Sequence, residues 1–324
     1  MPQTIFITGA SGYIGTVLTS HCIASGYTVR ALSRSSDSDT KLLSLGAIPT
    51  RGGLASHDVL TREASSVDMV IALADALAGN YGNMTMEERS EINNAAIAAL
   101  AAGMEGSGKP LVVTSGTLQV ADDPQGNETD ETAPSWPEPI FGVGVEATAL
   151  KLKEKGIRVS VVRLAPWVYG RGGSGVRLFM QGAVVTGELI YVDDGSARTT
   201  TVHVDDAARL FLLVAQNGGV GEIYNATSET HVTFKQLMEA IGRTICVPVR
   251  SQSYADTEAT RGRFIASFLS LQNRASNKKA REELGWTVES KVGILDEIAV
   301  GSYVSVVKEL RESKASKVEL DVVD

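Results

Sequence analysis

The chain is predicted to fold as an α/β protein, a doubly wound parallel sheet with a smaller C-terminal lobe. Three observations predict this architecture. Strand-like apolar runs alternate with helix-like segments through the first half of the chain, which is typical of repeated βαβ units. A glycine-rich turn joins the first strand to the first helix, as in sheets of the Rossmann type. From Ala165 onward the alternation breaks down, so we expect a second lobe there.

Seven runs rich in β-branched and aliphatic residues are predicted strands, namely residues 4–8, 28–32, 47–50, 69–73, 110–114, 159–164 and 222–225. Helices are predicted over residues 12–25, 40–45, 86–104, 146–155, 205–216 and 233–244. Gly26, Gly46 and Gly156 stand where three of these helices should end. The seventh strand lies beyond residue 165, so we expect a later segment to return to the sheet.

The turn at residues 8–15 has the composition of a dinucleotide cradle. It reads TGASGYIG and directly follows an apolar run. Gly9 permits the tight turn, Gly12 lets the backbone approach a pyrophosphate, and Gly15 lets the helix pack close to the strand. The anion then lies on the free N–H groups of the helix N-terminus. The expected cofactor contacts in this segment are Gly9, Ser11, Gly12, Tyr13, Ile14 and Gly15.

The end of the second predicted strand favours NADP(H) over NAD(H). In such sheets an acidic residue there binds the ribose of NAD, whereas an arginine accommodates the additional phosphate of NADP. Here the strand ends in Ser33 and Arg34, and no carboxylate stands at that point. Arg34 offers a planar fork to a phosphate, and Ser33 adds a hydroxyl. The alternative is that Arg34 is a solvated surface residue and that Asp37 or Asp39 folds back to serve NAD.

Composition and charge argue against several classes of function. A net charge of -8 and a pI near 5.2 disfavour binding to nucleic acid or to an anionic membrane. No apolar run approaches the roughly 18 residues that a membrane span requires, and no signal-type segment is present. Cys22 and Cys246 each stand in an apolar setting and are expected to be buried free thiols in a reducing compartment. His21, His57 and His231 lack partners at ligand spacing, so no metal is expected. The sequence therefore predicts a cytoplasmic monomer or homodimer with a small-molecule substrate.

Several segments, in order along the chain, resemble the short-chain dehydrogenase/reductase superfamily in its extended, epimerase/dehydratase-like form. Besides the glycine-rich turn, they are VVTSGT at 112–117, RLAPWVYGRG at 163–172, VHVDDAAR at 202–209 and KAREELGW at 279–286. The resemblance is greatest to the atypical branch, whose members keep the NADP fingerprint but hold the catalytic residues poorly. It implies further cofactor contacts at the carboxyl ends of the strands, at Leu73, Ala74, Thr114 and Pro166.

The resemblance also implies which catalytic residues are present. The family uses Asn, Ser, Tyr and Lys side chains, with the Tyr and Lys one helical turn apart. Asn93 matches the asparagine, and Ser115 matches the serine that orients the carbonyl. The Tyr and Lys positions are Phe141 and Val145, and neither side chain transfers a proton. The family's pocket is therefore expected without its standard mechanism.

Two residues, Asp75 and Tyr81, are candidates to replace the missing acid. Asp75 follows the fourth strand, and a half-buried carboxylate beside a nicotinamide can have a raised pKa; the alternative is a helix cap or turn carboxylate. Tyr81 lies in a glycine-rich loop that could reach the pocket, unless its ring simply packs. Ser115 could bind a substrate oxygen, unless it caps the local turn. Trp136 and Trp167 flank the predicted cleft and could wall an aromatic substrate, with core packing as the alternative.

Three functions are compatible with these residues. The leading hypothesis is an NADP(H)-dependent oxidoreductase or epimerase acting on a small organic compound, aromatic compounds and secondary metabolites included, with a non-standard proton donor. The second is a non-redox isomerase, lyase or cyclase on the same scaffold. The third is a binding protein that senses NADP(H). Residues 1–165 would form the dinucleotide-binding Rossmann domain, to which later segments return, residues 166–312 mainly the substrate-binding lobe, and residues 313–324 a flexible, charged tail.

Overall fold

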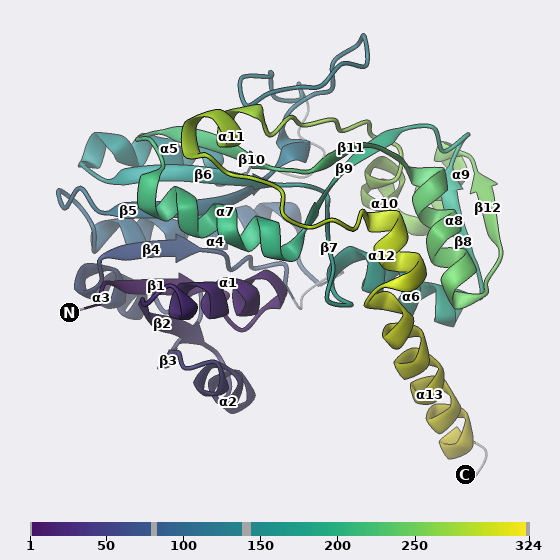
Figure 1. The fold of residues 1–324 in the computed structure, drawn as a ribbon, viewed down its shortest axis with the longest axis horizontal. Coiled ribbons are helices and arrows are strands. Elements are labelled where there is room, and N and C mark those ends of the chain that lie inside the picture. Colours follow the sequence, from purple (N-terminus) through teal and green to yellow (C-terminus); the bar gives the residue numbers. More distant parts are fainter. Residues whose placement is uncertain (1, 79–82, 138–143, 322–324) are drawn as a thin grey trace.

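The computed structural model describes residues 2–78, 83–137 and 144–321, and its larger part is built on one parallel sheet (Figure 1). The seven strands have the order β10-β6-β5-β4-β1-β2-β3, and all six pairings between them are parallel. They are β1 (Thr4–Thr8), β2 (Thr28–Ser33), β3 (Ile48–Arg51), β4 (Met69–Ala72), β5 (Pro110–Gly116), β6 (Arg158–Leu164) and β10 (Glu222–Ala226). Every predicted strand is present, and the doubly wound fold class is confirmed.

The order of the strands creates a crevice at one point of the sheet. From β1 the chain proceeds outward to β2 and β3, and then crosses back to β4 on the other side of β1. The connections after β1 and after β4 therefore leave the sheet in opposite directions. Ligands of doubly wound sheets bind outside the carboxyl ends of the strands at such a switch point.

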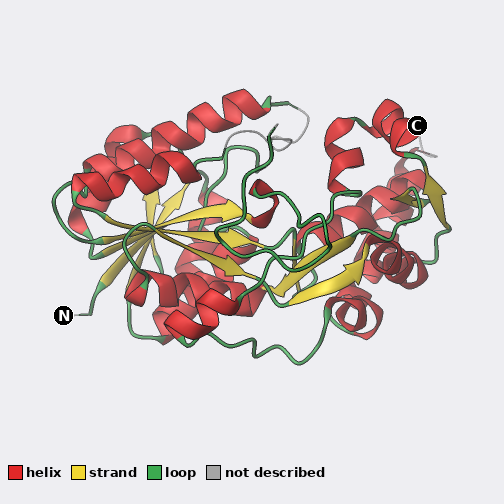
Figure 2. Ribbon diagram, turned by 90° about the horizontal axis from the view of Figure 1, so that it is seen from above, coloured by secondary structure: helices red, strands yellow, loops and turns green. Residues whose placement is uncertain are grey.

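Helices cover both faces of the sheet (Figure 2). On one face α1 (Tyr13–Ala24) packs against α7 (Val204–Asn217), and both bury apolar side chains in one core cluster. On the other face α3 (His57–Ser66), α4 (Met86–Ala102) and α5 (Glu146–Leu150) share a second cluster with the strands. The strands between them are buried on both sides, which explains their continuous apolar runs.

The helices depart from the sequence prediction at several places. Helix α2 (Ser36–Ser44) begins earlier than predicted, because the Ser35 hydroxyl accepts the N–H of Ser38 and caps it. Helix α3 was not predicted, since its sequence is polar apart from a few buried residues. The predicted helix over 146–155 is divided into α5 and the 3-10 turn η2 (Lys151–Lys155).

The smaller body follows β6. It contains a three-stranded sheet of β11 (Glu229–Thr233), β9 (Arg198–His203) and β7 (Trp167–Tyr169), and a parallel pair of β12 (Val249–Gln252) and β8 (Leu189–Val192). Its helices are α6 (Ser174–Thr186), α8 (Phe234–Ile245), α9 (Tyr254–Arg261), α10 (Arg263–Phe268), α12 (Ile294–Val300) and α13 (Tyr303–Asp321), and α11 (Lys278–Leu284) packs back against β10 and α7. Helix α13 includes residues 313–321, for which the sequence predicts a flexible tail.

The lobe has a hydrophobic core of its own. Trp167, Phe234 and Tyr303 are almost completely buried in it, together with aliphatic residues of α6, α8 and α12. Helix α8 enters this core with a capping box, in which Thr233 and Gln236 bond each other's backbone N–H groups. Within the described part of the chain, no helix is long and apolar enough to cross a membrane.

Candidate active site

The three glycines of the glycine-rich turn differ in how closely other backbone atoms approach them. Gly9 has a φ of +74°, and a Cβ there would lie 2.8 Å from the backbone nitrogen of Ala74. A Cβ on Gly15 would overlap the carbonyl oxygen of Gly9 and lie 2.7 Å from the Cα of Ala10. The fold itself therefore requires glycine at both positions. Gly12 differs, because its Cβ would have one neighbour within 4 Å, the carbonyl oxygen of Gly9 at 3.1 Å.

The first turn of α1 offers backbone donors to an anion. The helix begins at Tyr13, and its N-cap, Gly12, has no side chain that could accept from the first turn. Among the described residues, the N–H groups of Tyr13 and Ile14 have no acceptor. Unpaired N–H groups and the helix dipole attract negative charge. The turn and α1 therefore have the geometry of a dinucleotide cradle. The carbonyl oxygen of Ser11, in the same turn, accepts from Lys41 Nζ at 2.9 Å.

The side chain of Tyr13 supports the cradle from behind. Its hydroxyl donates to the carbonyl oxygen of Gly170 at 2.7 Å, and a Cβ on Gly173 would lie 2.6 Å from its ring. Tyr303 donates to the carbonyl oxygen of Gly173 at 2.8 Å and accepts the N–H of Gly170 at 3.0 Å. Burial and the neighbouring Tyr303 raise the pKa of Tyr13 far above its ordinary value. The phenol of Tyr13 therefore holds the loop of residues 170–173 in place. The backbone N–H of Tyr13 remains available to a ligand.

The end of β2 presents an arginine without a protein partner. Arg34 is exposed, and its guanidinium makes no hydrogen bond or ion pair within the described ranges. Ser33 is buried and donates to the carbonyl oxygen of Ser35 at 3.2 Å, so its hydroxyl is already used. Asp39, one of the two carboxylates that could serve NAD instead, is paired with Arg51.

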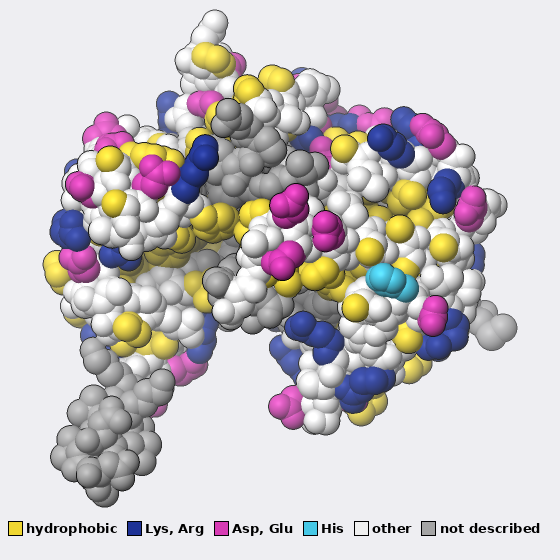
Figure 3. All heavy atoms as spheres, turned by 180° about the vertical axis from the view of Figure 1, so that it is seen from behind, with side chains coloured by type: hydrophobic (Ala, Val, Ile, Leu, Met, Phe, Trp, Pro, Cys, Tyr) yellow, Lys and Arg dark blue, Asp and Glu magenta, His cyan; other side chains and the backbone are white. Residues whose placement is uncertain are grey.

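A cavity of about 480 Å³ lies at the carboxyl ends of β4 and β5, beside α4 and α10. Its lining is mostly apolar, and hydrophobic side chains are visible in the furrow between the sheet and the smaller lobe (Figure 3). The polar side chains of the lining are Thr8, Asp75, Arg89, Ser90, Asn93, Thr114, Ser115 and Gln119. Eight predicted site residues meet here, namely Ile14, Leu73, Ala74, Asp75, Asn93, Thr114, Ser115 and Pro166. The other described ones belong to the cradle and to the end of β2.

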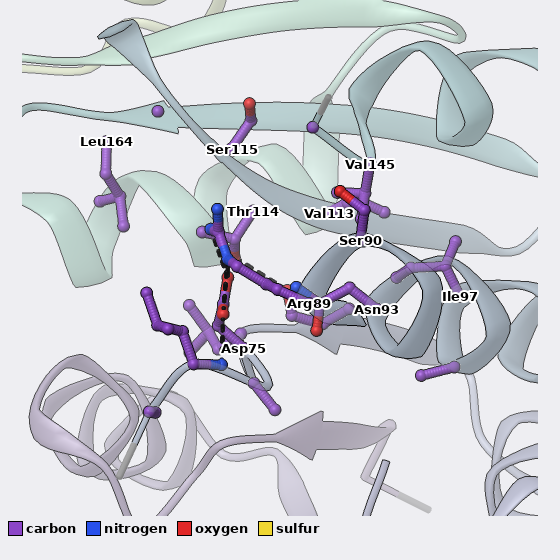
Figure 4. Close-up of a pocket in the computed structure, with 18 of the residues that line it drawn as sticks. Asp75, Arg89, Ser90, Asn93, Ile97, Val113, Thr114, Ser115, Val145 and Leu164 are labelled. Carbon is purple, nitrogen blue, oxygen red and sulfur yellow. Dashed lines mark hydrogen bonds and ion pairs between the residues drawn. The ribbon is translucent and has the colours of Figure 1, made fainter. Parts of the chain in front are cut away.

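The predicted polar residues of the lining differ in what their side chains already bind (Figure 4). Thr114 donates to the carbonyl oxygen of Ala72 at 2.8 Å. Asn93 is 9% exposed, and its Oδ1 accepts the N–H of Ala76 at 2.9 Å, so it fixes the loop after β4. The hydroxyl of Ser115 has no protein partner in the part of the chain that the structure describes, and it borders the cavity. Ser115 is therefore the predicted polar residue that remains available to a substrate.

Asp75 is ion-paired, in contrast to the acid expected from the sequence. Arg89 donates from Nε to both carboxylate oxygens, at 2.9 and 3.0 Å, and from a terminal nitrogen at 2.6 Å (Figure 4). The N–H of Leu77 adds a bond at 2.9 Å. Burial by itself raises the pKa of Asp75, but the bonds and charge of Arg89 outweigh it, and the pKa lies below its ordinary value. The expectation of a raised pKa is wrong, because the sequence does not reveal the partner. The geometry is that of a turn carboxylate.

Two of the residues discussed from the sequence lie outside the described residues. These are Tyr81, a candidate acid, and Phe141, at the family's tyrosine position. Val145, at the lysine position, precedes α5 and lines the cavity with an apolar side chain. Glu146, next in the chain, is bound to the buried Arg163 and is not a member of the lining.

Sequence reasoning missed several members of the lining. Arg89 lies one helical turn before Asn93 on α4, so this spacing could have placed the two on one face. Phe264 and Phe268 have the same spacing on α10. Gln119 follows β5 in the turn η1 (Thr117–Gln119), where no pattern in the sequence distinguishes it.

The two tryptophans proposed as cleft walls have other surroundings. Trp167 is fully buried, with ring centroids 5.2 Å from Phe179 and 5.5 Å from Phe268, and belongs to the core of the lobe. Trp136 donates from Nε1 to the carbonyl oxygen of Leu118 at 3.1 Å. Neither lines the cavity; Phe264 and Phe268 supply its aromatic wall.

Solved structures share this architecture. The UDP-glucose 4-epimerase of Thermotoga maritima, determined with UDP-glucose, superposes with a TM-score of 0.74 and 22% sequence identity, covering 94% of this chain and 99% of that one. The UDP-glucose 4-epimerase of Thermus thermophilus, in complex with NAD, has a TM-score of 0.71 and 18% identity, with coverage of 94% and 99%. At these identities the likeness concerns the fold.

Sequence comparison adds the family. An uncharacterised protein of Saccharomyces cerevisiae is 34% identical over 297 residues, which are 91% of this chain and 97% of that protein. A 4-hydroxy-2-methyl-3-oxo-4-farnesyl-3,4-dihydroquinoline-1-oxide ketoreductase of Stigmatella aurantiaca is 27% identical over 237 residues, 72% of this chain and 70% of that one. The model of the NAD dependent epimerase/dehydratase family matches residues 5–227. With the parallel sheet, the glycine-rich turn and the cavity beside it, this match establishes that the chain belongs to the NAD dependent epimerase/dehydratase family.

Proposed function

We propose that the protein is an NADP(H)-dependent oxidoreductase that interconverts a carbonyl and an alcohol on a small organic substrate. The observation that carries the proposal is the free hydroxyl of Ser115 in a cavity that borders the glycine cradle, since Ile14 and Thr8 line the same cavity. The ketoreductase among the relatives is consistent with this chemistry. The lobe over residues 166–312 would supply mainly substrate contacts, as Phe264 and Phe268 suggest.

The cradle fits a dinucleotide. A Cβ on Gly12 would have a single close neighbour, the carbonyl oxygen of Gly9, and the N–H groups of Tyr13 and Ile14 favour a pyrophosphate as the anion. Arg34 would hold the 2′-phosphate of NADP, because its guanidinium is exposed and Asp39 is committed to Arg51. A bound reduced nicotinamide supplies the hydride for carbonyl reduction.

The lining residues would orient the substrate rather than exchange its proton. Ser115 donates a hydrogen bond to the substrate oxygen, which polarises the carbonyl. Asp75 stays ionised against Arg89 at neutral pH, so it does not donate a proton. The proton that joins the product oxygen then comes from water at the mouth of the cavity. We expect Ser115→Ala to lower turnover about ten- to a thousand-fold at saturating substrate.

Cofactor choice is tested by Arg34→Glu. The variant loses a charge-assisted bond worth about 1.5–3 kcal/mol, so calorimetry should show NADPH affinity about ten- to a hundred-fold weaker and NADH affinity little changed. Arg243→Glu is the matched control, because its side chain is 72% exposed on α8, remote from the cradle in sequence and fold. Equal NADPH affinity of Arg34→Glu and wild type would refute the role of Arg34.

A second candidate is a non-redox isomerase, lyase or cyclase. It is favoured by Phe141 and Val145, which stand where the family has its proton-transferring pair. Conversion of a substrate with no net change in nicotinamide absorbance, and at the same rate without added nucleotide, would establish it. Nucleotide binding without conversion of any compound in a carbonyl panel would instead indicate a sensor of NADP(H).

A further inference from the structure

We infer that the cavity takes an uncharged substrate with a flat apolar group and rejects compounds that carry phosphate or carboxylate. The inference rests on the proposed function in that it assigns to the substrate the lining contributed by Ser115, Gln119, Phe264 and Phe268, and leaves to the nucleotide the lining contributed by expected cofactor contacts such as Ile14 and Ala74. It separates this chain from its structural neighbours, among which is an epimerase solved with UDP-glucose.

The charges of the lining cancel one another. Arg89 is the one cation and Asp75 the one anion among the described residues of the lining, and they hold each other through three contacts between 2.6 and 3.0 Å. A phosphate or carboxylate would therefore lose its hydration without gaining a cation.

One wall of the cavity is aromatic. Phe264 and Phe268 come from successive turns of α10, with ring centroids 6.4 Å apart and an interplanar angle of 2°. Phe268 is anchored from behind by Trp167, at 5.5 Å, and by Phe179, at 6.5 Å. Phe264 lines the cavity and is 40% exposed. Such a surface favours stacking of a planar ring.

The remaining polar groups are neutral. Ser115 on β5 contributes a hydroxyl, and Gln119 contributes an amide that lies close to Gly144, where a Cβ would be 3.1 Å from Gln119 Oε1. Neutral donors beside an apolar wall are the usual composition of a site that binds an uncharged molecule and orients it by a few hydrogen bonds. The matching ligand has a carbonyl oxygen and a planar apolar ring system.

The preference for uncharged ligands, called the charge rule below, is tested with ligands that differ in charge. With NADPH present, calorimetry on the full chain would compare 2-acetonaphthone, 6-acetyl-2-naphthoic acid and UDP-glucose. We expect the neutral ketone to bind at least about tenfold more tightly than its carboxylate, and UDP-glucose not to bind measurably. Equal or tighter binding of either anion, or failure of the neutral ketone to bind, would overturn the inference.

Two variants sharpen the test. Gln119→Lys places an ammonium in the cavity and should bring the carboxylate to at least the affinity of the neutral ketone. Phe264→Ala should weaken the ketone about three- to tenfold through lost stacking, whereas Val300→Ala, 81% exposed on α12, should not. If Phe264→Ala and Gln119→Lys both leave the two affinities unchanged, the cavity is not the binding site.

Binding and turnover are read separately, so the two proposals fail in different ways. Tight binding of the neutral ketone without NADPH oxidation would contradict the oxidoreductase proposal and leave the charge rule standing. Oxidation of NADPH by a charged carbonyl compound in preference to its neutral analogue would contradict the inferred preference for uncharged substrates and support the oxidoreductase proposal.

Discussion

Replacement of single glycines in the cradle separates what the fold needs from what the nucleotide needs. In Gly15→Ala the new Cβ would overlap the Gly9 carbonyl oxygen and approach the Ala10 Cα to 2.7 Å, and both are backbone atoms that cannot rotate away. Overpacking of this kind costs about 3 kcal/mol or more, and the better helix propensity of alanine returns about 1 kcal/mol. The net loss of about 2 kcal/mol lowers the Tm by roughly 3 °C for a chain of 324 residues.

Gly12→Ala should behave differently. Its Cβ meets the Gly9 carbonyl oxygen alone, at 3.1 Å, and the backbone φ of -74° suits any residue. Alanine is a poorer N-cap than glycine, so the free energy of unfolding should fall by about 1 kcal/mol. The same Cβ enters the space left for the pyrophosphate, and we expect nucleotide affinity to fall about ten- to a hundred-fold.

Thermal unfolding by circular dichroism and calorimetric titration with NADPH and NADH measure the two effects. Gly182→Ala is the control, because a Cβ there has no neighbour within 4 Å and lies on an exposed turn of α6. It should bind normally and be more stable by up to about 1 kcal/mol. A folded Gly12→Ala variant with wild-type nucleotide affinity would refute the role of Gly12 in nucleotide binding. A Gly15→Ala variant as stable as wild type would refute the requirement of the fold for glycine at position 15.

Three further predictions concern other groups. Glu146→Ala should lower the free energy of unfolding by about 3–5 kcal/mol, because the Arg163 side chain is 5% exposed and would lose its partner; a loss under about 1 kcal/mol in urea titration would contradict this. Asp75→Asn should have a lower free energy of unfolding than wild type at pH 7. This difference in stability should be lost as the pH falls below about 3.9, the ordinary pKa of aspartate, and then through the lower pKa of Asp75 in the folded protein. A stability difference that does not depend on pH would show that the charge of Asp75 is not its cause. Burial raises the pKa of the Cys22 thiol to about 12, so iodoacetamide at pH 8 should modify the exposed Cys246 and spare Cys22, as intact mass measures; equal modification would disprove the burial.

Local patterns in the sequence predict the sheet and the cradle well. A buried parallel strand must be apolar on both faces. The sequence therefore shows β1, β4, β5 and β6 as short continuous runs of apolar residues. The glycines of the turn follow from backbone geometry that few other residues tolerate, as the contacts at Gly9 and Gly15 illustrate. Ser115 could be placed because it ends a strand, and strand ends converge on one edge of the sheet.

Pairings between distant segments could not be predicted in the same way. Asp75 and Arg89 are 14 residues apart and meet because a loop returns to α4, which no local pattern encodes. Glu146 belongs to α5, and its carboxylate is bound by Arg163 from β6, which follows 17 residues later. For Trp167 the sequence leaves a cleft wall and core packing both open, and its burial depends on helices that follow much later in the chain.

The bonds of Tyr13 and Tyr303 impose an order on biosynthesis. Gly170 follows Tyr13 by 157 residues, and Tyr303 follows Gly170 by another 133. A nascent chain leaves the ribosome from its N-terminal end, so the strands up to β6 can pair while the loop behind the cradle still lacks Tyr303. We therefore expect nucleotide binding to reach its full affinity only after α13 docks. A chain interrupted before residue 303 would contain every strand of the sheet but lack the bonds that Tyr303 makes to the loop of residues 170–173.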